Sequence, residues 1–167
     1  VNAQKLTSNI GIAHTRWATH GKVSEENSHP HTSNNVAVVH NGIIENHQQL
    51  KQYCLDKGYK FVSETDTEVI AHAIDSELQS NISLIESVKK AVSSLKGSYG
   101  LGIISSNFPD RIIATRKGSP LLIGIGENGN YIASDQIALL SETKKFIFLE
   151  DGDIAEIKID KVTIFDI

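Results

Sequence analysis

The chain has 167 residues and a mass of 18.3 kDa, enough for one domain with a sizeable core and too little for two ordinary ones. Hydrophobic residues make up 40% and charged residues 22%, and no apolar run approaches the roughly 18 residues that span a bilayer, which argues against disorder and membrane insertion. With 20 acidic and 16 basic residues the net charge is −4, which excludes a nucleic-acid surface built on charge.

The first forty residues combine one predicted strand with a polar loop. Residues 10–17 alternate in polarity and predict a strand, and a polar loop follows to about residue 35. The short apolar run 36–39 ends in His40, Asn41 and Gly42. Because Asn and Gly both tolerate positive φ, we expect the backbone to bend sharply at Asn41 and Gly42.

Three helices are predicted in the middle of the chain. The first covers residues 46–57 and ends at Gly58. The second begins near residue 65 or 66, where Thr65 and Glu68 have the spacing of a capping box. The third begins at Ser83, which has the same spacing to Glu86, and it ends before Gly97.

Short apolar or alternating runs fill the remainder and predict strands. They cover residues 98–104, 111–116, 121–125, 145–149, 154–159 and 162–166. The turns between most of them are too short for parallel crossovers, so neighbouring strands should pair antiparallel. The expected fold class is therefore α+β, in a single domain over residues 1–167 without an internal linker.

Arg16 and Trp17 lie where the first predicted strand gives way to a loop. Arg16 is one of only three arginines, and its guanidinium could bind a carboxylate at two points. Trp17 could cover a ligand and exclude water. The alternative is a surface arginine paired with a nearby acid and a tryptophan in the core.

The Asn41–Gly42 pair could present a side-chain amide and a backbone N–H to one oxygen. That is how an oxyanion hole for acyl transfer is built, and losing one such donor raises the barrier by ~3–4 kcal/mol. The alternative is an ordinary hairpin turn.

Asp66 lies at the start of the second predicted helix, where a carboxylate is favoured as a cap. The functional alternative is an acceptor for a ligand's ammonium group. Together with Arg16 for a carboxylate, Asp66 would then define an amino-acid site.

The histidines and the single cysteine are weaker candidates. Five of the seven histidines precede residue 41, but carboxylate or cysteine ligands at metal-binding spacing are lacking, so no metal site is predicted. Cys54 falls on the apolar stripe of the first helix and is expected to pack rather than react. One cysteine also excludes an internal disulfide, which fits the cytoplasm.

Six segments together resemble the glutaminase domain of the glucosamine-6-phosphate synthases, in the class II glutamine amidotransferase family. The segments are 14–21, 39–46, 63–70, 118–121, 133–136 and 146–154. The resemblance implies an N-terminal-nucleophile fold, a four-layer sandwich of antiparallel sheets and helices. It also implies that glutamine is hydrolysed and its ammonia delivered to fructose 6-phosphate, giving glucosamine 6-phosphate, without a cofactor.

The resemblance assigns roles to the candidate residues. Arg16 would hold the α-carboxylate of glutamine, with Thr19 and His20 assisting, and Trp17 would belong to the loop that closes over the substrate. Asp66, with Gly42, would hold the α-amino group. Asn41 and Gly42 would form the oxyanion hole.

One feature departs from the family. The family's nucleophile is an N-terminal cysteine whose α-amine acts as its base, whereas residue 1 here is Val1. We therefore expect a truncated glutaminase domain that lacks its N-terminal segment, is inactive alone, and belongs to a homo-oligomeric parent with a C-terminal sugar-isomerase domain. The alternative is a non-catalytic amino-acid-binding or interaction module of the same fold.

Overall fold

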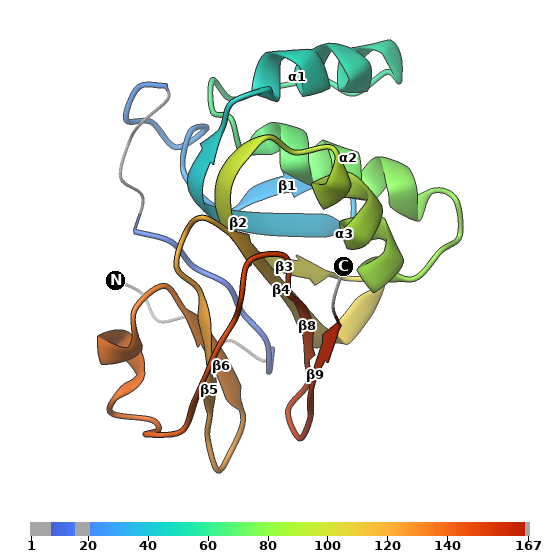
Figure 1. Cartoon of the computed structure of the whole chain (residues 1–167). Coiled ribbons are helices and arrows are strands. Elements are labelled where there is room, and N and C mark those ends of the chain that lie inside the picture. Colours follow the sequence, from blue (N-terminus) through green and yellow to red (C-terminus); the bar gives the residue numbers. More distant parts are fainter. Residues whose placement is uncertain (1–7, 16–20, 166–167) are drawn as a thin grey trace.

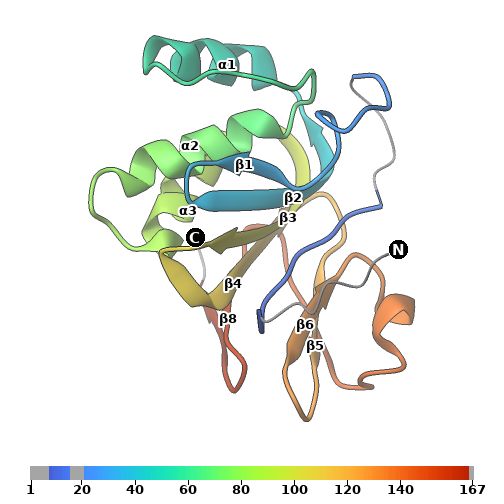
Figure 2. The same cartoon turned by 180° about the vertical axis from the view of Figure 1, so that it is seen from behind.

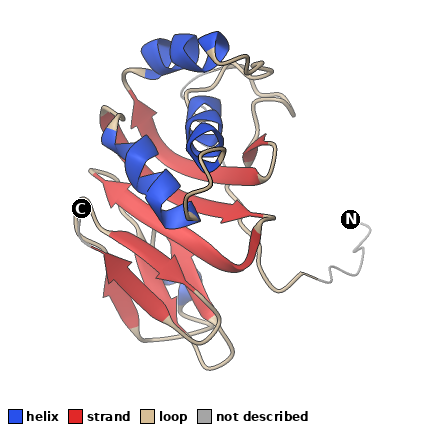
Figure 3. Cartoon of the chain, turned by 90° about the vertical axis from the view of Figure 1, so that its right-hand side faces the viewer, coloured by secondary structure: helices blue, strands red, loops and turns tan. Residues whose placement is uncertain are grey.

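Two antiparallel sheets stack face to face, and helices cover the outer face of the larger one (Figure 1). The computed structural model describes residues 8–15 and 21–165. Figure 3 shows the helices lying over strands of the sheet structure, seen from a third direction.

The larger sheet has six strands in the order β1-β2-β3-β4-β8-β9, and every neighbouring pair is antiparallel. The strands are β1 (His31–Ser33), β2 (Val36–Ile44), β3 (Gly97–Ser105), β4 (Phe108–Lys117), β8 (Ile154–Ile157) and β9 (Val162–Phe165). The smaller sheet has the order β6-β5-β7, formed by β5 (Leu122–Ile125), β6 (Asn130–Ala133) and β7 (Phe146–Phe148).

The helices are α1 (His47–Asp56), α2 (Glu68–Leu78) and α3 (Leu84–Ser93), with the short 3-10 helix η1 (Gln136–Leu139) beside the smaller sheet. Helix α2 packs against α3, β1 and β2, and α1 packs against α2. The N-cap of α3 is Ser83, whose hydroxyl accepts a hydrogen bond from the Glu86 amide, as the sequence predicted.

The alternation along β4 divides the core into two parts. Ile113 belongs to the cluster between the helices and the larger sheet, whereas its neighbours Ile112 and Ala114 belong to the cluster between the two sheets. Successive side chains of a strand point to opposite faces, so one strand contributes to both parts. The larger sheet is therefore buried on both faces.

A glycine on β3 lets the two sheets approach closely. A Cβ at Gly102 would lie 2.7 Å from the Ile132 Cδ1 atom of β6 and 3.0 Å from Val39 Cγ2. No side chain fits there without displacing these neighbours.

The segment before residue 15 does not form the predicted strand. Residues 8–15 are extended but unpaired with either sheet, and residues 16 and 17 of the prediction lie outside the described residues. Ile10 packs against the core between the sheets, and the segment passes across this side of the molecule (Figure 2). The alternation therefore indicates partial burial rather than strand pairing.

Asn41 and Gly42 lie within a continuous strand rather than in a turn, and β2 curves strongly towards its C-terminal end (Figure 1). Strand β2 continues to Ile44, and its pairing with β3 keeps one register, with Gly42 opposite Tyr99 and Ile44 opposite Gly97. Gly42 has a positive φ of 141° within this paired strand, so the Asn41–Gly42 pair forms no hairpin turn.

The antiparallel α+β class is confirmed, and the remaining predicted helices and strands are present within a few residues of their expected bounds. Two strands were missed. The sequence pattern places β1 in the polar loop before residue 35 and predicts no strand at β6. Both are short edge strands that depend on pairing with β2 and β5, which a local pattern does not contain. No helix among the described residues is long and apolar enough to cross a bilayer.

The two-sided core gives a stability prediction. Ile113 is fully buried, so Ile113→Ala should lower the free energy of unfolding by about 2–5 kcal/mol through lost burial and a cavity. Ile164→Ala on β9 is the matched control, because Ile164 is 40% exposed and should cost less than about 1 kcal/mol. Denaturant unfolding of both variants measures the difference, and equal losses would contradict this division of the core.

Candidate functional site

Asp66 connects the start of α2 to the end of β2. Its carboxylate is 4% exposed, and Oδ2 accepts a hydrogen bond of 2.7 Å from the Ile44 amide. The charged acceptor thus satisfies a backbone donor 22 residues earlier in the chain. This bond brings Asp66 to the strand that carries Asn41 and Gly42.

The expected capping by Thr65 or Asp66 is wrong. Helix α2 begins at Glu68, its N-cap is Thr67, and neither the Thr67 side chain nor that of Asp66 caps the helix. The Thr65 hydroxyl instead lies 3.0 Å from His31 Nε2 and 3.0 Å from the Ser63 hydroxyl. Thr65 and Glu68 have the spacing of a capping box, but the Thr65 and Asp66 side chains bind residues from other segments instead of capping the helix.

Gly42 can only be glycine in this backbone. Its φ of 141° is strained for a residue with a side chain, and a Cβ would overlap the Ser98 carbonyl on β3. The Asn41 side chain beside it is half-buried and has no hydrogen-bond partner within the described part of the chain. Its amide is therefore available to donate to a ligand oxygen.

Thr67 contacts two histidines from different segments. Its hydroxyl oxygen lies 3.0 Å from His40 Nδ1 and 3.1 Å from His29 Nε2, and Thr67 itself is 1% exposed. Burial lowers the pKa of His40, although the negative charge of Asp66 opposes this. His40 is therefore neutral near pH 7.

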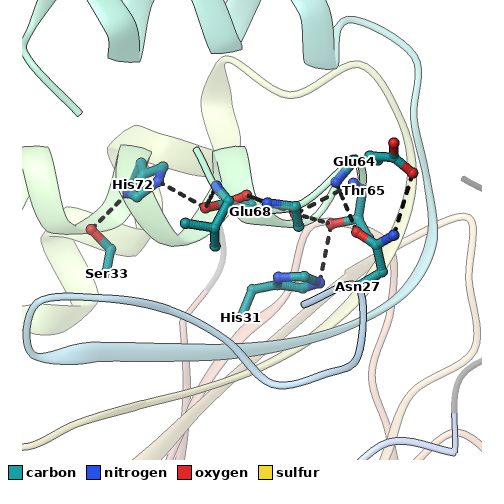
Figure 4. A network of polar contacts seen from close by, with 9 residues as sticks. Asn27, His31, Ser33, Glu64, Thr65, Glu68 and His72 are labelled. Atoms are coloured by element: carbon teal, nitrogen blue, oxygen red, sulfur yellow. Dashed lines mark hydrogen bonds and ion pairs between the residues drawn. The ribbon is translucent and has the colours of Figure 1, made fainter. Parts of the chain in front are cut away.

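Glu68 is a buried carboxylate with several donors. It accepts hydrogen bonds from the Val62 amide at 3.0 Å, the Ser63 amide at 2.8 Å and the Ser63 hydroxyl at 2.6 Å, and it lies 3.5 Å from His72 Nε2 (Figure 4). Burial opposes ionisation of Glu68, but these hydrogen bonds and His72 outweigh burial and lower its pKa. Glu68 thereby holds segment 62–68 against α2.

Asn27 and Glu64 bind the residues that directly follow the 16–20 segment. The Asn27 amide donates to the Lys22 carbonyl at 3.0 Å. Its oxygen accepts from the Glu64 amide at 2.8 Å (Figure 4). The Lys22 amide in turn donates to the Glu64 carboxylate at 3.3 Å. These bonds attach residue 22 to the segment that carries Asp66.

The structure places Asp66 against the end of β2, the strand that contains the candidate residues Asn41 and Gly42. The other four lie outside the described residues: Arg16, Trp17, Thr19 and His20. The sequence did not predict the contact between His40 and Thr67, which are the sequence neighbours of Asn41 and Asp66. The only indication in the sequence was that a threonine and a histidine each adjoin a candidate residue. That these two side chains contact each other depends on the tertiary fold.

Cys54 is too buried to act as a nucleophile. It is fully buried on α1, and burial raises the pKa of its thiol to about 11. A protonated, enclosed thiol is a poor nucleophile, which supports the predicted packing role. Within the described ranges, no three His, Cys, Asp or Glu side chains are grouped so as to hold a metal ion.

Comparison with known proteins identifies the family. A model of the glutamine amidotransferase domain matches residues 14–141. The chain belongs to this glutamine amidotransferase family. It is 57% identical, over 96% of its length, to the glutamine–fructose-6-phosphate aminotransferase (isomerizing) of Escherichia coli K12, and 55% identical, over 99%, to that of Haemophilus influenzae.

The chain spans only 26% and 27% of these two relatives. Among solved structures, the glutamine phosphoribosylpyrophosphate amidotransferase of Bacillus subtilis matches with a TM-score of 0.75 and 29% identity, over 92% of this chain and 34% of that one. The expected fold, the sandwich of the N-terminal-nucleophile amidotransferases, is thereby confirmed.

The lowered pKa of Glu68 gives a pH prediction. A carboxyl whose pKa falls below its unfolded value of about 4.3 stabilises the fold above that pH, and the stabilisation is lost as the pH falls through the folded-state pKa. Glu68→Gln should cost about 2–3 kcal/mol near pH 7 and progressively less in acid. Urea unfolding from pH 7 to 3 measures this.

Glu127→Gln is the matched control, because Glu127 is an exposed turn residue. Its stability should follow the wild-type curve at each pH. A Glu68→Gln difference that stays constant with pH would contradict the assignment.

The Cys54 thiol gives a labelling prediction. With a pKa of about 11 and no exposure, native Cys54 should react with a disulfide reagent at pH 8 at least about a hundredfold more slowly than the unfolded chain. Absorbance of the released thiolate, with and without urea, measures both rates. Comparable rates would show that the thiol is accessible.

Proposed function

We propose that this site binds glutamine and takes part in its hydrolysis. The observation that carries the proposal is the Asp66–Ile44 bond, which places a buried carboxylate beside the strand of Asn41 and Gly42. One oxygen of Asp66 holds the strand, and the other is directed to the α-amino group of the substrate. The family membership supports this use of the site.

In this proposal Asn41 and Gly42 stabilise the oxyanion that forms when the side-chain amide of glutamine is attacked. The Asn41 amide and the Gly42 N–H donate to one oxygen as its negative charge develops. Arg16 binds the α-carboxylate, with Thr19 and His20 assisting, and Trp17 covers the substrate. These last four assignments rest on the sequence motif alone.

The attacking thiol is not Cys54, because Cys54 is enclosed and protonated. In our proposal the nucleophile is an N-terminal cysteine that is not among these 167 residues. The isolated chain then binds glutamine without turning it over.

For the whole protein, we propose the activity that the names of its relatives state, amino transfer from glutamine to fructose 6-phosphate with isomerisation. The identity of 55–57% over nearly the whole chain supports it. The product would be glucosamine 6-phosphate, formed in a C-terminal sugar-isomerase domain of a homo-oligomeric, cytoplasmic enzyme.

A non-catalytic amino-acid-binding module is the second candidate. Burial of Cys54 supports this candidate, because the enclosed thiol cannot attack a bound amino acid. Both candidates bind glutamine, and they differ in whether the complete protein hydrolyses it.

The role of Asp66 gives a binding prediction. Calorimetry should show that the chain prefers L-glutamine over glutaramate, which is glutamine without its α-amino group, by about tenfold or more, since a charged hydrogen bond is lost. Asp66→Asn should remove most of this preference. Asp135→Asn is the matched control, because Asp135 is exposed and only caps η1.

A chain that binds glutamine and glutaramate equally would contradict the proposed amine contact. Loss of the preference in both variants would assign the effect to charge in general rather than to Asp66.

A further inference from the structure

Thr67 lies where the two halves of the candidate site meet. Thr67 directly follows Asp66, and His40 directly precedes Asn41, so the 3.0 Å contact between the Thr67 hydroxyl and His40 Nδ1 joins the two halves side chain to side chain. The Asp66–Ile44 bond joins them a second time, through the backbone of β2.

We propose that Thr67 and His40 are positioning residues that fix the Asp66 carboxylate relative to the Asn41–Gly42 amide pair. The inference deepens the proposed function and rests on it. Neither side chain need touch the substrate, because each acts through its neighbour in sequence.

The hydrogen-bond partners of His40 show which atom is the donor in its contact with Thr67. His40 Nε2 lies 3.5 Å from the Ser98 carbonyl, which can only accept, so the ring proton of neutral His40 is on Nε2. Nδ1 then accepts a hydrogen bond from the Thr67 hydroxyl. The same hydroxyl oxygen accepts from His29 Nε2, 3.1 Å away. The hydrogen bonds thus run from His29 through Thr67 to His40.

The surroundings keep His40 in the neutral form that this direction requires. His40 is 3% exposed, and its burial lowers its pKa. Of the charged or titratable groups facing it, Asp66 opposes this shift, whereas His14 and His31 reinforce it. A buried hydroxyl between two imidazoles then has both its donor and its acceptor used.

The hydroxyl of Thr67 can be removed with little change of shape. In Thr67→Val, a methyl group would face the buried Nδ1 of His40 and the Nε2 of half-buried His29, which leaves polar groups unsatisfied and releases the His40 ring. Thr67→Ser keeps the hydroxyl. Thr115→Val is the matched control, because Thr115 is fully buried on β4 and its hydroxyl has no hydrogen-bond partner among the described residues.

The experiment measures glutamine binding and the preference over glutaramate by calorimetry, with thermal midpoints for all variants. Thr67→Val should weaken L-glutamine binding by about tenfold or more and reduce the preference, whereas Thr67→Ser should stay within about threefold of the wild type. Thr115→Val should bind like the wild type. A purely structural role would lower the midpoint without changing the preference between ligands.

Nitrogen-15 NMR of the imidazole rings provides a readout without ligand. His40 should show a protonated Nε2 and an unprotonated Nδ1 at pH 7.5 in the wild type and in Thr67→Ser. If Thr67→Val fails to fold, this tautomer decides the question. A proton on Nδ1 would overturn the inference.

The outcomes separate the inference from the proposed function. A wild-type chain that binds no glutamine overturns both. A chain that binds glutamine, loses the preference in Asp66→Asn and keeps it in folded Thr67→Val retains the proposed function and overturns the role of Thr67.

Discussion

The hydrogen bond from the Ile44 amide to the Asp66 carboxylate holds the two halves of the site together. It joins the last residue of β2 to the segment that leads into α2, and both are buried. A carboxylate acceptor strengthens the bond, and the low exposure protects it from water. The bond connects two segments that helix α1 separates in the chain.

The polar interior around the start of α2 is stable because its members satisfy one another. Asp66, Thr67 and Glu68 are consecutive, all buried, and each reaches a different segment: the end of β2, the histidines, and residues 62–63. Buried charges cost free energy unless they are hydrogen-bonded, which here they are.

Two glycines allow close approach of the backbone, Gly42 between neighbouring strands and Gly102 between the two sheets. Gly42 accommodates the Ser98 carbonyl at a backbone angle that side chains disfavour, and Gly102 lets β6 pack against β3. The Asn-Gly pair was recognised in the sequence as a place of unusual backbone. Its use inside a paired strand, rather than in a turn, follows from the neighbouring strand β3, which a local pattern does not contain.

Hydrophobic periodicity and local motifs were enough to predict the α+β class, the three helices and most of the strands, because these signals act between near neighbours in the chain. Local motifs also singled out Asn41, Gly42 and Asp66 as candidate residues. The tertiary structure decided that Thr65 and Asp66 do not cap α2 and that His40 meets Thr67. These hydrogen bonds join residues 22 to 34 positions apart in the chain, and they form in place of local capping bonds.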